Sequence, residues 1–271
     1  MEKFTRLFCR LDETNRTGEK VLALEEYFTS AEPADAAWAL FFLSGRKIKR
    51  AVPTRHLSEW AAKESATPIW LLSECYEAVG DLAETVALLL PEHQTRTERP
   101  LHALVEEKLL PLPEMSEEAR RLTIVGLWRE MSSAQRLVWN KLITGSFRVG
   151  VAKTLVVRAL AGVAGVSQAE MTHRVLRFGE PNAEEYRRLF EEQPRAGAIH
   201  PYPFFLAHPL ETLPEELGSP GDWIAEWKWD GIRGQLVKRR GEIAVWSRGE
   251  ELVTDTFPEM RLAGSFLPDG T

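Results

Sequence analysis

Apolar residues recur every three to four positions through most of residues 1–192, the spacing that places them on one face of an α-helix. Phe4, Leu7 and Leu11 show this spacing at the start of the chain. The pattern predicts helices over residues 4–11, 19–28, 34–43, 54–66, 68–78, 82–90, 101–110, 116–131, 165–178 and 184–192, and two apolar helices that flank residues 145–151. We therefore expect an all-α domain in this part of the chain.

The pattern changes after residues 195–203, which are rich in proline and glycine and are typical of a linker. We place the domain boundary near residue 196, which predicts one domain over residues 1–196 and a second over 197–271. In the second domain, residues 234–238 and 243–246 are expected to form a β-hairpin, followed by a short helix near residue 258.

Residues 223–229 alternate bulky apolar and polar side chains, which predicts a half-buried strand. The tryptophans at 223, 227 and 229 would lie on its covered face, and Lys228 on the opposite face between Glu226 and Asp230. Asp230 and Gly231 then supply turn residues. A lysine held on such a strand is a candidate nucleophile.

Composition and charge narrow the classes of protein that fit. Hydrophobic residues make up 44% of the chain and charged residues 27%, which is typical of a globular protein with a core. No apolar run reaches membrane-spanning length, so we expect a cytoplasmic protein without a membrane partner. Cys9 and Cys75 are too few for a metal site and are expected to be reduced core thiols. The net charge of −6 argues against indiscriminate coating of nucleic acid, so any nucleic-acid contact must come from local basic clusters.

The first basic cluster follows the apolar helix at residues 34–43 and consists of Arg46, Lys47, Lys49 and Arg50. Cations are favoured near a helix C-terminus, so the cluster could be a solvated helix end. Lysine and arginine also donate to phosphate oxygens, so it could equally be a phosphate-contacting loop. The residues themselves leave both interpretations open.

The second basic cluster lies in a long run without acidic residues, from residue 131 to residue 169, which carries five positive charges. Within it Gly145 and Gly150 bracket a loop that contains Arg148, and Lys153 lies on the helix that follows. Glycines permit close backbone approach and a helix N-terminus favours a phosphate, so we favour a DNA-contacting loop. The alternative is an ordinary helix hairpin whose charges are solvated.

The sequence from Lys228 to Arg233, Lys-Trp-Asp-Gly-Ile-Arg, resembles the lysine motif of the covalent nucleotidyltransferases, which include DNA ligases, RNA ligases and capping enzymes. A Ser-Arg-Gly cluster at residues 247–249 follows the hairpin, and a helical domain with two basic clusters precedes the motif. Together these features resemble a bacterial ATP-dependent DNA ligase with an N-terminal DNA-binding domain. The resemblance implies a multi-domain chain, with an all-α DNA-binding domain before the first, strand-rich part of an α+β nucleotidyltransferase (adenylation) domain.

The resemblance also implies roles for individual residues. The amine of Lys228 would attack the α-phosphate of ATP with Mg²⁺ present, and the AMP would pass to the 5′-phosphate of nicked double-stranded DNA. Glu226, Arg233 and Arg248 would contact ATP, and Asp230 and Gly231 would shape the turn beside Lys228. No residue is assigned to the metal. The expected DNA-binding residues are Arg46, Lys47, Lys49, Arg50, Arg148, Gly150 and Lys153.

Two expectations limit this hypothesis. Attack requires a neutral Lys228, whereas Glu226 and Asp230 favour the charged form of its amine. The family would continue beyond Thr271 into an acidic motif, a later lysine motif and an oligonucleotide-binding domain. We therefore expect a monomeric fragment of the full enzyme that binds nicked DNA weakly and does not seal it. A non-catalytic DNA-binding module and a helical scaffold are the alternatives.

Overall fold

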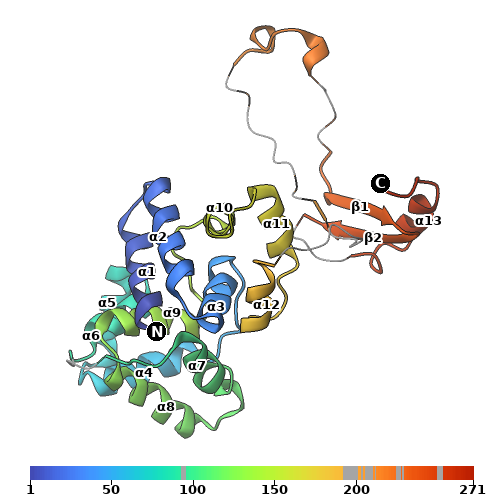
Figure 1. Cartoon of the computed structure of the whole chain (residues 1–271). Helices are drawn as coiled ribbons and strands as arrows, with labels where there is room; N and C mark the ends of the chain where they lie inside the picture. Colours follow the sequence, from blue (N-terminus) through green and yellow to red (C-terminus); the bar gives the residue numbers. More distant parts are fainter. Residues whose placement is uncertain are drawn as a thin grey trace. The chain divides into compact units, whose positions relative to one another are not determined.

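The structure is a computed structural model that describes residues 1–92, 96–191, 201–202, 204, 210, 212–223, 227, 229–248 and 253–271. The chain divides into two compact units (Figure 1). The first unit comprises Met1–Met171 with Phe178–Glu191, and the second comprises Thr172–Arg177 with Glu192–Thr271. The domain boundary expected near residue 196 stays a prediction.

The first unit has a helix in each range predicted up to residue 164 and in the range 184–192, where the helix ends at Arg188. Its helices are α1 (Glu2–Glu13), α2 (Thr17–Ser30), α3 (Pro33–Leu43), α4 (Thr54–Glu64), α5 (Ile69–Val79), α6 (Leu82–Leu89), α7 (Leu101–Leu104), the π-helix η1 (Val105–Leu109), the 3₁₀-helix η2 (Leu112–Glu114), α8 (Glu117–Glu130), α9 (Ser133–Thr144), α10 (Lys153–Ala164) and α12 (Ala183–Arg188). Helix α11 (Gln168–Leu176) contributes residues to both units. The expected all-α architecture is therefore confirmed.

Local chemistry explains where these helices begin and end. The side chain of Ser132 accepts from the backbone N–H of Gln135 at the start of α9, and the Gln135 side chain bonds back to the backbone of Ser132. Helices α9 and α10 end at Gly145 and Gly165, which both adopt φ of +66°. Glycine takes this left-handed conformation without a Cβ clash, so each glycine stops its helix.

An aromatic cluster in the first unit joins α1 and α3 to the loop after α9. Phe147 of that loop stacks on Phe4 with ring centroids 5.5 Å apart, and it also lies against Phe8 and Phe42. All four side chains are buried. Because aromatic burial contributes much of the stability of a core, this cluster anchors the loop to the core through Phe147.

The second unit contains an antiparallel hairpin of β1 (Gly234–Arg239) and β2 (Glu242–Ser247), in register from Gly234 opposite Ser247 to Arg239 opposite Glu242. Arg240 and Gly241 form the turn with φ of +53° and +78°, the left-handed pair that a two-residue hairpin needs. The predicted hairpin is confirmed, with each strand slightly longer than expected. Short 3₁₀-helices η3 (Pro214–Glu216) and η4 (Pro220–Asp222) precede it.

Helix α13 (Glu259–Ser265) confirms the helix expected near residue 258 and packs on the hairpin. A Cβ added at Gly264 would lie 2.9 Å from Cγ2 of Ile243, so a larger residue there would displace the Ile243 side chain. After α13 the chain returns to β1, where Lys238 donates its N–H to the carbonyl of Thr271 and accepts from the N–H of Gly270, both at 2.8 Å.

The strand predicted over residues 223–229 is not found at its described positions; residues 224–226 and 228 lie outside the described residues. Trp223, Trp227 and Trp229 are not in a strand, and their side chains are 53%, 83% and 83% exposed. The expectation that these tryptophans lie on a covered face is therefore wrong here. An apolar strand face is buried only against a second layer, and the described part of this unit offers one hairpin whose cover is α13.

Candidate nucleic-acid interface

The two basic segments lie side by side, although about a hundred residues separate them in the chain. The N–H of Ala51 donates to the carbonyl of Ile143 at 3.1 Å. A Cβ added at Gly145 would lie 3.3 Å from the carbonyl oxygen of Ile48. Gly145 thus permits a backbone approach that brings residues 46–50 against the loop of residues 145–150.

The loop of residues 145–150 has an inner and an outer side. Phe147 and Val149 are buried, whereas Ser146, Arg148 and Gly150 are exposed. This alternation is that of an extended segment with one covered face. The covered side chains anchor the loop, and the side chain of Arg148 is directed to solvent.

Four predicted DNA-binding side chains are available to a ligand. Lys47, Lys49, Arg50 and Arg148 are exposed, and none of them has a hydrogen-bond or ion-pair partner among the residues that the structure describes. Lys153 begins α10, whose N-cap Ala152 supplies no side-chain acceptor. The partial positive charge at the N-terminus of α10 would favour a phosphate beside it.

Arg46 differs from its three basic neighbours. Its guanidinium donates to the carbonyls of Phe178 at 3.3 Å and Gly179 at 2.5 Å, and it lies 4.5 Å from the centre of the Phe41 ring. Partial burial lowers the pKa of Arg46. These contacts give Arg46 a structural role, and its expected contact with DNA stays a prediction.

The acid-free run also contains two basic residues that hold the fold together. Arg136 is 1% exposed and donates to the carbonyls of Trp128, Leu90 and Pro91 at 2.7, 3.4 and 2.8 Å. Lys141 pairs with Asp81, with Nζ and Oδ2 2.6 Å apart. The charge pattern could not separate these residues from exposed ones, because burial depends on elements that are distant in sequence.

Sequence reasoning also missed Lys20. This α2 lysine is buried, and its Nζ donates to the carbonyl of Gly150 at 2.8 Å across 130 residues. A single lysine near the start of a predicted helix carries no sequence signal of such a role.

The nucleotide site is only partly described. Lys228 and Glu226 lie outside the described residues. Arg233 and Arg248 are brought together at the open end of the hairpin, where the N–H of Arg248 donates to the carbonyl of Arg233 at 3.0 Å. Asp230 and Gly231 form an exposed bend just before this point. Two of the three expected ATP-contacting residues therefore lie next to each other, and their contact with ATP stays a prediction.

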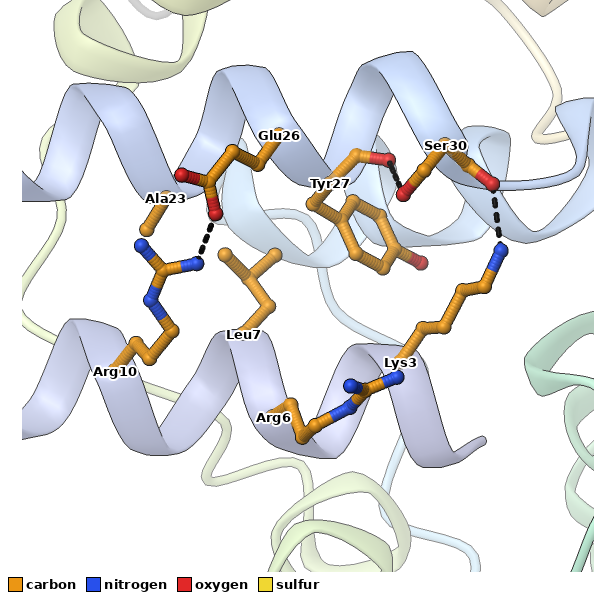
Figure 2. Close-up of a pocket in the computed structure, with 8 residues that line it drawn as sticks. All are labelled: Lys3, Arg6, Leu7, Arg10, Ala23, Glu26, Tyr27 and Ser30. Carbon is orange, nitrogen blue, oxygen red and sulfur yellow. Dashed lines mark hydrogen bonds and ion pairs between the residues drawn. The ribbon is translucent and has the colours of Figure 1, made fainter.

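A groove of about 210 Å³ between α1 and α2 lies elsewhere on the first unit (Figure 2). Figure 2 shows Lys3 Nζ donating to the carbonyl of Ser30 at 2.6 Å and Arg10 paired with Glu26. These basic groups bind α1 to α2, so the groove is a helix–helix contact rather than a candidate site.

Two further features concern metals and membranes. The described residues contain no group of three or more His, Cys, Asp or Glu side chains that could hold a metal ion. None of the helices described is long and apolar enough to cross a membrane. Cys9 and Cys75 are free thiols as expected, but both are partly exposed rather than in the core.

Comparison with known protein families matches both parts of the chain. Residues 1–161 match the family described as DNA ligase N terminus, and residues 204–268 match the family described as ATP dependent DNA ligase domain.

Relatives that are named as DNA ligases occur in bacteria and archaea. A "Probable DNA ligase" of Koribacter versatilis is 25% identical over 91% of this chain and 44% of that protein. A "Probable DNA ligase" of Anaeromyxobacter sp. is 30% identical over 56% of this chain and 30% of that protein. The "DNA ligase 1" of Korarchaeum cryptofilum is 23% identical over 96% of this chain and 49% of that protein. The chain thus spans less than half the length of these relatives.

Proposed function

Because the chain belongs to the ATP-dependent DNA ligase family, we propose that it takes part in sealing nicks in duplex DNA through a lysyl-AMP intermediate. The first unit would hold the nicked duplex, and the second would carry the lysine that accepts AMP. We further propose that the protein acts as a monomer in the cytoplasm, at the nucleoid when DNA is bound, in repair, replication and recombination.

The DNA-binding part of this proposal rests on one observation, which is the close approach of the two basic segments, residues 46–50 and 145–150. The backbone of the segment that carries Lys47, Lys49 and Arg50 lies against the loop that carries Arg148, and α10 begins shortly after that loop. Phosphate contacts position a protein on DNA without reading its sequence, which suits an enzyme that must accept any nick. These basic side chains would contact the phosphate backbone of DNA rather than the edges of its bases.

The chemistry would follow three steps, in which one adenylate is transferred twice and then released. The amine of Lys228 attacks the α-phosphorus of ATP, so a P–N bond forms while the bond to pyrophosphate breaks. The 5′-phosphate at the nick then displaces Lys228 and takes the AMP. Attack by the 3′-hydroxyl joins the strand and releases AMP. A neutral amine at Lys228 is required for the first transfer.

The remaining residues would orient the nucleotide. Glu226 would accept a hydrogen bond from the adenine amino group, and Arg233 and Arg248 would donate to ribose and phosphate oxygens. Their adjacency at the open end of the hairpin supports a shared ligand. Asp230 and Gly231 would set the turn that directs Lys228.

Mg²⁺ is proposed as the divalent ion that accompanies ATP. When bound, it would screen the charges of the ATP phosphates during attack by Lys228. The alternative of a non-catalytic DNA-binding module is not favoured, because residues 204–268 match the ATP-dependent ligase domain.

DNA binding is tested by fluorescence anisotropy with a nicked duplex at several salt concentrations. R148A should weaken binding about tenfold and lower the slope of log K against log salt by about one, because one phosphate contact is lost. R121A removes an α8 arginine that is paired with Glu118, and it should leave both quantities unchanged. Equal binding by R148A and the wild type would contradict this assignment of the surface.

Adenylate transfer is tested separately by incubation with α-labelled ATP and magnesium, followed by denaturation. Label retained on the wild type and absent from K228M would support Lys228 as the acceptor. K49M should label as the wild type does, because Lys49 belongs to the proposed DNA surface. Failure of the wild type to retain label would favour the binding-module alternative.

A further inference from the structure

Lys20 occupies an unusual environment for a lysine. It lies in the first turn of α2 and is 8% exposed, whereas Glu19 and Leu22 beside it are exposed. Lysine is rarely buried unless its ammonium is hydrogen-bonded, because removing the charge from water is costly. The burial of Lys20 therefore requires a partner that fixes its amine.

The partner is the carbonyl oxygen of Gly150, 2.8 Å from Nζ. Gly150 adopts φ of +60°, so the chain turns sharply at this residue before α10 begins. A carbonyl in such a turn has no helix or sheet partner of its own, and Lys20 supplies the donor.

This hydrogen bond completes the support of the loop of residues 145–150. Gly145 lies against the backbone of Ile48 at one end, Phe147 is buried in the middle, and Lys20 holds Gly150 at the other end. Arg148, the exposed basic residue, lies between these fixed points. The direction of Arg148 is therefore set by three contacts from three different parts of the first unit.

Helix α2, which carries Lys20, also positions α10. A Cβ added at Gly162 of α10 would lie 2.5 Å from Oε1 of Glu25, so α2 and α10 pack closely at this point. Helix α2 thus holds both the loop, through Lys20, and the helix that follows it.

We infer that Lys20 is a positioning residue for DNA binding, which acts through the Gly150 carbonyl to keep Arg148 and the start of α10 aligned on a phosphate backbone. The inference rests on the proposed DNA-binding function. Lys20 is itself buried, so it does not contact phosphate.

A double-mutant cycle in the full chain tests this role. K20M keeps much of the side-chain volume and removes the donor, and it should weaken binding of nicked duplex about tenfold, as R148A does. The K20M/R148A double variant should bind within about twofold of R148A, because both changes disable the same contact. K63M removes an exposed α4 lysine with the same change in charge and should bind like the wild type.

Hydrogen exchange without DNA supplies a second readout, which a general loss of stability would not reproduce. In K20M the amides of residues 148–151 should exchange faster, while those of α8 keep the wild-type rate. K20R retains a charged donor and should restore binding to within about threefold of the wild type.

Each outcome has a distinct consequence. Additive losses in K20M and R148A would show that Lys20 contacts DNA independently, which would overturn the inference. Wild-type binding and loop exchange in K20M would overturn it as well, while leaving the proposed function standing. If the wild-type chain did not bind nicked duplex, that result would contradict the proposed function itself, and with it the inference that rests on it.

Discussion

Arg136 shows at the scale of one residue how a positive charge can serve the fold rather than a ligand. It donates to the terminal carbonyl region of α8 at Trp128 and to the carbonyls of Leu90 and Pro91 just after α6. These carbonyls would otherwise lack partners at helix ends. Burial lowers the pKa of Arg136.

R136M should destabilise the protein by roughly 3 kcal/mol, because several buried carbonyls lose a charged donor together. Urea unfolding followed by circular dichroism measures the loss. R158M, which removes an exposed arginine of α10 from the same acid-free run, should cost less than about 0.5 kcal/mol. Similar costs for the two variants would show that Arg136 is not a structural donor.

Asp81 links a helix cap to an ion pair at the same scale. Burial raises the pKa of Asp81, but the hydrogen bond from Lys141 and the backbone N–H groups at the start of α6 outweigh it and lower the pKa overall. The stability that ionised Asp81 contributes to the fold is therefore fully present above its ordinary pKa of 3.8. It is lost as pH falls through the lowered pKa of the folded state.

K141M removes a hydrogen bond that lowers the pKa of Asp81, while the effect of burial, which raises this pKa, remains. The pKa of Asp81 should therefore rise in the variant. The variant should be about 1 kcal/mol less stable than the wild type at neutral pH. Because protonation of Asp81 relieves its unpaired charge, the difference should shrink as pH falls through the pKa of Asp81 in the variant and close only at the lowered pKa of the wild type, below 3.8. Urea unfolding at several pH values measures it, and the D81N and D81N/K141M pair should show a pH-independent difference.

At the scale of elements, Gly145 decides whether the two basic segments can meet. Its left-handed conformation ends α9, and its missing Cβ allows the backbone of residues 48–50 to approach. Gly165 ends α10 with the same φ of +66° but has nothing within 4 Å of its Cβ position. The two glycines therefore form a matched pair.

G165A should cost about 1 kcal/mol, which is the backbone penalty alone. G145A should cost about 1 kcal/mol more, because its methyl group pushes against the Ile48 carbonyl, and it should also weaken binding to nicked duplex. Urea unfolding and fluorescence anisotropy measure the two effects. Equal behaviour of the two variants would mean that the close approach at Gly145 does not hold the segments together.

At the scale of the whole molecule, the proposed DNA surface and its supporting core belong to the first unit. The aromatic cluster around Phe147 and the donor at Lys20 are internal to that unit. The second unit exposes Trp227 and Trp229 at 83% and Phe266 at 81%, whereas the most exposed large apolar side chains described in the first unit, Trp70 and Leu88, are 66% and 65% exposed. The two units therefore differ in how completely each buries its own apolar surface.

Residues 1–196 alone should fold and bind nicked duplex with an affinity within about threefold of the full chain. Circular dichroism and anisotropy check both points and also test the boundary placed near residue 196. A loss of more than about tenfold would show that residues 197–271 contribute directly to the DNA surface.

Much of this protein follows from local sequence. Helical periodicity, the capping residues and the turn at Arg240–Gly241 predict the helices and the hairpin, because each depends on residues only a few positions apart. The run from Lys228 to Arg233 likewise carries its family resemblance without reference to any fold.

Tertiary structure decided which charges serve DNA binding and which serve the fold. Arg148 and Arg136 lie in one acid-free run, yet one is exposed and the other buried, and Lys20 became significant only through Gly150. The burial of a side chain and the partner of a donor are set by elements that the fold brings together from distant parts of the chain. The sequence by itself determined the elements and the candidate chemistry, and the packing of α2 on α10, together with the close approach at Gly145, decided where the basic loop of the first unit lies.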